Sequence, residues 1–191
     1  MFRLLLLTDR HQLPPGRDLV STVARCAEAG LAAVVLRELD LAEDQRADLA
    51  SLLGEHVRVV AARGPLPGTH GVHLAAHQDL AKAGPAGTHG RSCHDDDEIA
   101  RAVAEGADYV TISPVAMSAS KPGYGPALGV DGVRRAVAAA QGVPVLALGG
   151  VDVGNVSEMR DAGAHGAAVM GTVMRAADPA AVTEQLLAGL S

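Results

Sequence analysis

Short runs of apolar residues alternate with longer segments of mixed polarity along the whole chain. The short runs show little of the polar–apolar alternation of a half-exposed strand, which is typical of parallel strands buried on both faces. We predict eight such strands, with the sequences RLLLLT, AAVVLRE, VRVVAA, GVHLA, HGRSC, YVTISPV, PVLALGG and GAAVMG. The segments between them, such as DLVSTVARCAEAG and LAEDQRADLASLLGEH, are predicted helices.

Capping residues indicate where several of these helices begin and end. Asp95 and Asn155 each precede a glutamate at the spacing of a capping box, and Asp178 precedes a proline at the first helical position. Glycines in EAGLAAV, GTHGVHL, EGADYVTI and DAGAHGAAV resemble C-caps that lead directly into a strand. We therefore predict a single domain over residues 1–191, an α/β fold of the (β/α)8 TIM-barrel class. A doubly wound sheet, the alternative, would normally use fewer strands.

One connection is too short for the repeating pattern. Only RGPLPGTH separates the third and fourth predicted strands, which is less than the roughly 10–12 residues that a crossover with a helix needs. We predict that the third helix is reduced or missing around Gly64–Gly68, which gives a compact barrel.

Composition narrows the range of partners. The chain has 191 residues, 48% of them hydrophobic, a net charge of −6 and no basic block, so we expect no nucleic-acid surface. No apolar run approaches the roughly 20 residues of a membrane span, and the first one is too short for a signal peptide. Two cysteines make no disulfide framework. We expect a cytoplasmic protein without a membrane partner, and leave a homo-oligomer open.

Four polar residues with candidate chemistry stand at the predicted carboxyl ends of strands, where barrels of this class place their active sites. They are Arg37, His73, Ser92 and Ser113. Arg37 stands on an otherwise apolar strand, where a guanidinium needs an anion, or else a structural pair with a buried carboxylate. His73 is within reach of the barrel mouth, so it is our candidate catalytic group.

Glycines follow the last two predicted strands, and each pair leads into a helix. They are Gly149 with Gly150, and Gly171 followed by Thr172. Barrels often hold a phosphate at these two turns, because backbone N–H groups can approach its oxygens where no side chain intervenes and a helix N-terminus adds positive charge. We predict a phosphate site there. Ordinary turns between strand and helix are the alternative.

Lysine is scarce in this chain, occurring only at Lys82 and Lys121. Lys121 lies in a stretch rich in Ser, Pro and Gly that follows the sixth predicted strand. We predict that it closes over the phosphate as a cation on a hinged loop. The alternative is a solvated loop lysine.

Two other features have simpler explanations than chemistry. The acidic run HDDDE, residues 94–98, is expected to cap the following helix, where the helix dipole favours negative charge, rather than to bind a metal. We therefore predict no metal ligands. Cys93 is expected to be a small buried residue, with a nucleophilic role as the minor alternative.

In their order and spacing these segments resemble the thiamine phosphate synthase/TenI superfamily. The resemblance rests on LLLLTDR, VVLRE, GVHL, GRSCH, ADYVTISPV followed by SK, VPVLALGGV and GAHGAAVMG. It implies a (β/α)8 barrel and a phosphorylated thiazole ligand held at Gly150, Gly171 and Thr172. It also implies that Arg37, Ser92 and Lys121 bind the diphosphate of the synthase's second substrate.

Departures from the synthase pattern decide which activity we favour. Ala61 and Ala62 replace the Asn-Asp pair that supplies a magnesium ligand, Val35 and Leu39 replace a glutamine and a lysine, and Asp79 is out of register with a second ligand. We therefore favour a TenI-type thiazole tautomerase without a cofactor. The alternatives are a thiamine phosphate synthase with an altered metal site, which would use Mg²⁺, and a non-catalytic binder or regulator.

Overall fold

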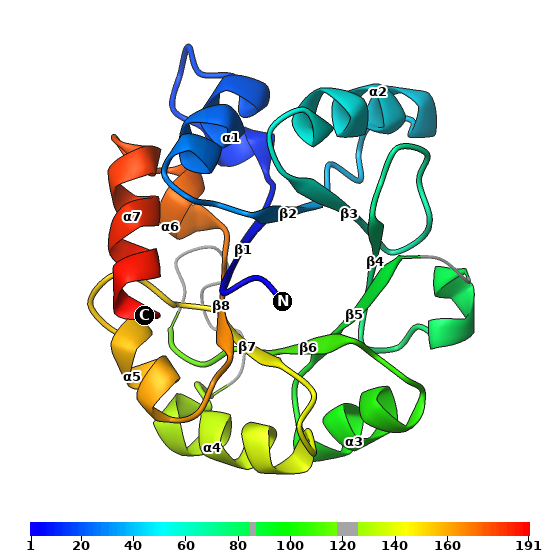
Figure 1. The fold of residues 1–191 in the computed structure, drawn as a ribbon, viewed down its shortest axis with the longest axis vertical. Coiled ribbons are helices and arrows are strands. Elements are labelled where there is room, and N and C mark those ends of the chain that lie inside the picture. Colours follow the sequence, from blue (N-terminus) through cyan, green and yellow to red (C-terminus); the bar gives the residue numbers. More distant parts are fainter. Residues whose placement is uncertain (85–86, 118–125) are drawn as a thin grey trace.

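The computed structural model describes residues 1–84, 87–117 and 126–191, which form a closed barrel of eight parallel strands with helices around it (Figure 1). Each strand pairs with its neighbours in chain order, and the last closes onto the first. This confirms the predicted TIM-barrel fold. The strands are β1 Leu4–Leu7, β2 Ala33–Leu36, β3 Arg58–Ala62, β4 Gly71–Leu74, β5 Thr88–Cys93, β6 Tyr109–Ile112, β7 Val145–Leu148 and β8 Gly166–Val169.

The third helix is missing, as predicted, because β3 leads to β4 through a loop without helical residues. Among the described residues of the fourth connection, only the short 3₁₀ helix η2 Leu80–Ala83 is helical, so the barrel wall near β4 has less helical cover than the rest (Figure 1). The described helices are η1 Arg10–Gln12, α1 Leu19–Glu28, α2 Glu43–Gly54, η2 Leu80–Ala83, α3 Asp96–Ala104, α4 Gly129–Ala139, α5 Val156–Asp161, α6 Gly171–Met174 and α7 Pro179–Gly189.

The predicted caps are largely confirmed. The side chains of Asp95 and Asp178 accept N–H groups of α3 and α7 at 2.8 and 3.4 Å. The glycines after α1, α3 and α5 have φ of 98°, 88° and 98°, as C-caps require. Two details differ from the prediction. Asn155 uses its side chain on the backbone of residues 150–152 rather than on α5, and Gly71 follows a loop instead of a helix.

Aliphatic residues and one tyrosine fill the barrel interior. Phe2 packs edge-on against the ring of Tyr109, with ring centroids 5.3 Å apart, and the N-terminus lies over the middle of the strand ring (Figure 1). Gly90 of β5 leaves the space that the Tyr109 ring occupies, because a Cβ at this position would collide with the ring. The interior is therefore closed at the amino ends of the strands and free for a site at their carboxyl ends.

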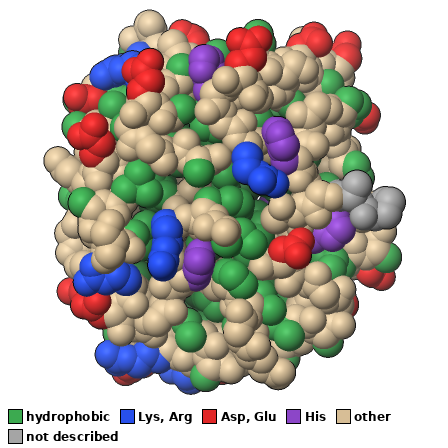
Figure 2. All heavy atoms as spheres, in the orientation of Figure 1, with side chains coloured by type: hydrophobic (Ala, Val, Ile, Leu, Met, Phe, Trp, Pro, Cys, Tyr) green, Lys and Arg blue, Asp and Glu red, His purple; other side chains and the backbone are tan. Residues whose placement is uncertain are grey.

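The face of the barrel that carries the N-terminus has no single patch of charged side chains (Figure 2). Figure 2 shows most acidic side chains of this face towards its rim, with basic, histidine and apolar side chains nearer its centre. Among the described helices, none is long and apolar enough to cross a membrane.

Candidate active site

A cavity of about 740 Å³ opens at the carboxyl ends of the strands. Its walls contain eight of the nine residues that the sequence singled out, although these come from six different strand ends. The ninth, Lys121, lies outside the described residues. The eight are Arg37, His73, Ser92, Ser113, Gly149, Gly150, Gly171 and Thr172.

The turns after β7 and β8 form one side of this cavity. Gly171 and Thr172 are the first two residues of α6, where a helix has no internal acceptors for its N–H groups. The Thr172 hydroxyl donates to the carbonyl oxygen of Val151 at 2.7 Å. This hydrogen bond connects the turn after β7 to the turn after β8, and both turns line the cavity.

The structure corrects the reason why Gly150 must be glycine. Its φ is 73°, and a Cβ at this position would lie 2.5 Å from the carbonyl oxygen of Met117 and 2.6 Å from the carbonyl carbon of Ala116. Close approach of the segment after β6 therefore excludes a side chain here, whether or not a phosphate binds. At Gly149, where φ is 87°, a Cβ would lie 3.0 Å from the Cα atom of Pro114, which is a tight but less severe contact.

His73 is buried in the cavity wall and hydrogen-bonded through both ring nitrogens. Its Nε2 lies 2.9 Å from Ser92 Oγ, and its Nδ1 lies 3.0 Å from Tyr109 Oη. The ring stacks on Tyr109 at a centroid distance of 5.5 Å. Burial lowers the pKa of His73 from 6.5 to about 4, so the imidazole is neutral at pH 7.

The neutral ring fixes the direction of these hydrogen bonds. Burial raises the pKa of Tyr109, so the phenol keeps its proton, and His73 is the only hydrogen-bond partner of this hydroxyl among the described residues. Tyr109 therefore donates to Nδ1, the proton of His73 sits on Nε2, and Nε2–H donates to Ser92 Oγ. The Ser92 hydroxyl is left to donate its own proton into the cavity.

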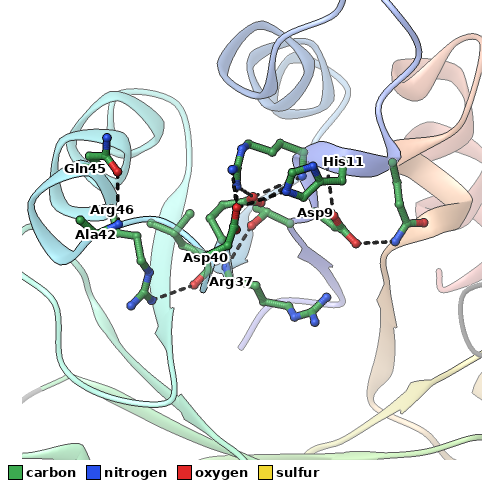
Figure 3. A network of polar contacts seen from close by, with 12 residues as sticks. Asp9, His11, Arg37, Asp40, Ala42, Gln45 and Arg46 are labelled. Atoms are coloured by element: carbon green, nitrogen blue, oxygen red, sulfur yellow. Dashed lines mark hydrogen bonds and ion pairs between the residues drawn. The ribbon is translucent and has the colours of Figure 1, made fainter.

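Arg37 has no carboxylate partner in the described part of the chain. Its Nη1 lies 2.7 Å from the sulfur of Met170, and Figure 3 shows its guanidinium turned away from the network around Asp40. Arg10 binds the two nearby carboxylates, Glu38 at 2.8 Å and Asp40 at 2.5 Å. The alternative of a structural Arg37–carboxylate pair is therefore wrong for these residues. We predicted Arg37 within the second strand, but β2 ends at Leu36 and Arg37 directly follows it.

Two further arginines, which we did not predict from the sequence, lie in the cavity wall. Arg63 directly follows β3; we had considered only the alanines before it. Arg175 lies one turn after Gly171, close enough for its guanidinium to occupy the space of a Gly171 side chain. Arg63 could have been found as the residue that directly follows a predicted strand. Arg175 could have been found as the residue one helical turn after the glycine at the start of a predicted helix.

The described residues do not fit a Mg²⁺ site, although the resemblance implies that ion for the synthase. Asp152 is the only described carboxylate in the cavity wall, and it accepts the N–H of Gly154 at 2.8 Å. Asp79 caps η2, accepting the N–H of Ala81 at 2.9 Å. Among the described residues, no three His, Cys, Asp or Glu side chains lie together as a metal site. Mg²⁺ prefers several oxygen ligands, which this wall lacks.

Neither Cys93 nor the carboxylates of the acidic run line the cavity. Cys93 is buried, and burial raises the pKa of its thiol to about 12, which leaves it protonated and unreactive at pH 7. The acidic run caps α3 through Asp95, as expected. Glu98, at its end, accepts the backbone N–H of His94 at 2.7 Å.

The family model and the curated relatives agree on one family. The family model of thiamine monophosphate synthase (TMP-TENI) matches residues 4–173. A putative thiamine-phosphate synthase from Geobacter sulfurreducens is 35% identical over 98% of this chain and 93% of its own length. A thiamine-phosphate synthase from Salinispora tropica is 41% identical over 76% of this chain and 70% of its own length. Among solved structures, a thiamine phosphate pyrophosphorylase from Pyrococcus furiosus shares the fold, with a TM-score of 0.86 and 23% identity over 98% of this chain and 95% of that chain.

Proposed function

The chain belongs to the thiamine monophosphate synthase family, and from this premise we propose that it is a thiamine-phosphate synthase. It joins a thiazole phosphate to a pyrimidine diphosphate and releases diphosphate. The observation that carries the proposal is the cavity wall, where a candidate phosphate site, an apolar floor and polar groups for a second anion lie together.

The comparisons favour the synthase over the TenI-type tautomerase that we preferred from the sequence. The curated relative at 41% identity is named thiamine-phosphate synthase, and the one at 35% identity is named putative thiamine-phosphate synthase. The site argues in the same direction. A tautomerase needs a proton-transfer group. Our candidate, His73, has both ring nitrogens in hydrogen bonds, and its lowered pKa of about 4 makes it a weak base.

We assign the thiazole phosphate to the side formed by β7 and β8. The first N–H groups of α6, at Gly171 and Thr172, bind its phosphate. The floor of the cavity beside them is apolar, with Leu7, Leu148 and Ala168 in its lining. This floor accommodates the flat heteroaromatic ring and excludes water from it.

We assign the pyrimidine diphosphate to the side formed by Arg37 and Ser92. The bond between the pyrimidine methylene carbon and the diphosphate oxygen breaks, and the oxygen keeps the electron pair. The thiazole nitrogen then forms the new bond to that carbon, so no oxidant or reductant is needed. Arg37 and the Ser92 hydroxyl stabilise the charge that develops on the leaving oxygen. His73 acts as a positioning residue that holds the Ser92 hydroxyl as a donor.

The test is a product assay. Protein, thiazole phosphate and pyrimidine diphosphate are mixed with Mg²⁺ or with EDTA, and thiamine phosphate and diphosphate are quantified. We expect equal amounts of the two products at about 1 per second or faster, the usual enzymatic range. The variant Arg37→Met should lose most of this activity. Absence of both products in both buffers would overturn the proposal, and conversion of a thiazole carboxylate phosphate alone would restore the tautomerase.

A further inference from the structure

Arginines gather at the carboxyl ends of β2 and β3. Arg37 follows β2 and Arg63 follows β3, and both line the cavity. The strands are paired with Leu36 beside Ala61, so the residues that follow them lie at the same edge of the mouth. A third guanidinium, that of Arg46 on α2, donates to the last carbonyl group of each strand at 3.4 and 3.3 Å.

No carboxylate of the described residues pairs with the guanidinium group of Arg37 or Arg63. The nearest acidic residues along the chain, Glu38 and Asp40, are bound by Arg10, and this pairing holds the pKa of Asp40 well below its usual range. Among the described residues, the side chain of Arg63 makes no hydrogen bond or ion pair, and the only polar contact of the Arg37 side chain is the sulfur of Met170. A chain with a net charge of −6 thus keeps unpaired positive charge at one edge of its cavity.

The backbone at Arg63 supports a specific role for this residue. Its φ of 70° lies in the left-handed region, which is unfavourable for a residue with a side chain. Two hydrogen bonds hold it there. Its N–H donates to the carbonyl of His73, and its carbonyl accepts the side-chain amide of Gln78, each at 2.8 Å. Strain of this kind is frequent at ligand-binding positions.

We propose that Arg37 and Arg63 together bind the diphosphate group and supply the positive charge that it needs, so that diphosphate binding by this protein does not depend on a divalent metal ion. This proposal rests on the proposed function, because the diphosphate belongs to the second substrate. It accounts for two observations at once: alanines stand where the resemblance implies a metal ligand, and arginine follows them without a partner.

Guanidinium chemistry suits this task. Arginine stays charged throughout the physiological pH range, and its planar donors bind phosphate oxygens in pairs. Two arginines at one edge of the mouth can hold both phosphoryl groups, and the Ser92 hydroxyl adds a neutral donor. The diphosphate then leaves as an ion already paired with protein cations.

The experiment is a calorimetric titration of inorganic diphosphate into the protein, once with EDTA and once with Mg²⁺. We expect binding in EDTA, with a Kd within about threefold of the value in Mg²⁺. The variant Arg63→Met should weaken binding in EDTA about tenfold or more. The matched control is Arg58→Met, at the opposite end of the same strand, where the exposed arginine lies outside the cavity lining; it should bind as the wild type does.

Two results would overturn the inference: diphosphate binding that requires Mg²⁺, or equal affinity of the two variants. The titration of the wild type decides the first point even if Arg63→Met fails to fold. The product assay distinguishes this failure from failure of the proposed function. Diphosphate binding that requires Mg²⁺, together with formation of thiamine phosphate, would remove the arginine site and leave the synthase. Metal-independent diphosphate binding without product would remove the synthase and leave the site.

Discussion

At the scale of single residues, the account depends on the Ser92 hydroxyl. Its oxygen accepts the proton of His73 Nε2, and His73 is oriented in turn by the buried Tyr109 hydroxyl. Two buried residues thus set the direction of one hydrogen bond at the surface of the cavity. The sequence predicted both His73 and Ser92 at the carboxyl ends of strands, but it could not show that both ring nitrogens of His73 would be occupied.

Tyr109→Phe tests this chain of hydrogen bonds. The variant keeps the ring that packs on Phe2 and His73 but removes the donor that fixes the tautomer of His73. We expect the KM for the pyrimidine diphosphate to rise about 2–10-fold, the equivalent of one neutral hydrogen bond of about 0.5–1.5 kcal/mol. In a Ser92→Ala background the same change should have no further effect. Additive effects of the two substitutions would show that Tyr109 acts independently of Ser92.

At the scale of elements, the apolar runs predicted the strands well because a parallel barrel buries each strand on both faces. The missing third helix followed from the length of one connection. The close packing of the β6 and β7 turns could not be predicted, since Gly150 contacts a segment more than thirty positions earlier in the chain. The arginine edge was missed for another reason: Arg63 directly follows the third strand, and only the alanines before it were considered.

Gly150→Ala measures how tightly these two turns pack. The added Cβ would lie 2.5 Å from a backbone carbonyl oxygen, so the segment after β6 must move. The control is Gly16→Ala, where φ is also positive, at 82°, and no atom lies within 4 Å of the new Cβ. We expect Gly150→Ala to lower the free energy of unfolding by about 1–3 kcal/mol more than the control does, the usual cost of overpacking. Equal losses in chemical denaturation would mean that only the backbone conformation matters.

At the scale of the whole molecule, the buried His73 couples stability to pH. Its pKa is about 4 in the folded protein and 6.5 in the unfolded chain, so the unfolded chain takes up the proton first as the pH falls. The stability that the neutral histidine provides is complete above about pH 6.5 and is lost as the pH falls towards 4. A difference of about 2.5 between the two pKa values corresponds to roughly 3 kcal/mol.

The measurement is denaturant unfolding of the wild type and His73→Gln between pH 7 and pH 4. We expect the free energy of unfolding of the wild type to fall more steeply, by up to about 3 kcal/mol over this range. His165, whose pKa is also lowered by burial, is present in both proteins and therefore cancels in the comparison. Parallel pH profiles would contradict a neutral, buried His73.

The central claim is that the barrel mouth holds two phosphorylated groups on different sides, a thiazole phosphate at β7 and β8 and a diphosphate at β2 and β3. A crystal structure of the protein with thiazole phosphate and inorganic diphosphate tests it most directly. The account predicts the thiazole phosphate within hydrogen-bond distance of the N–H groups of Gly171 and Thr172, and the diphosphate between Arg37 and Arg63. Ligands bound outside this cavity, or a diphosphate in the mouth that contacts neither arginine, would contradict it.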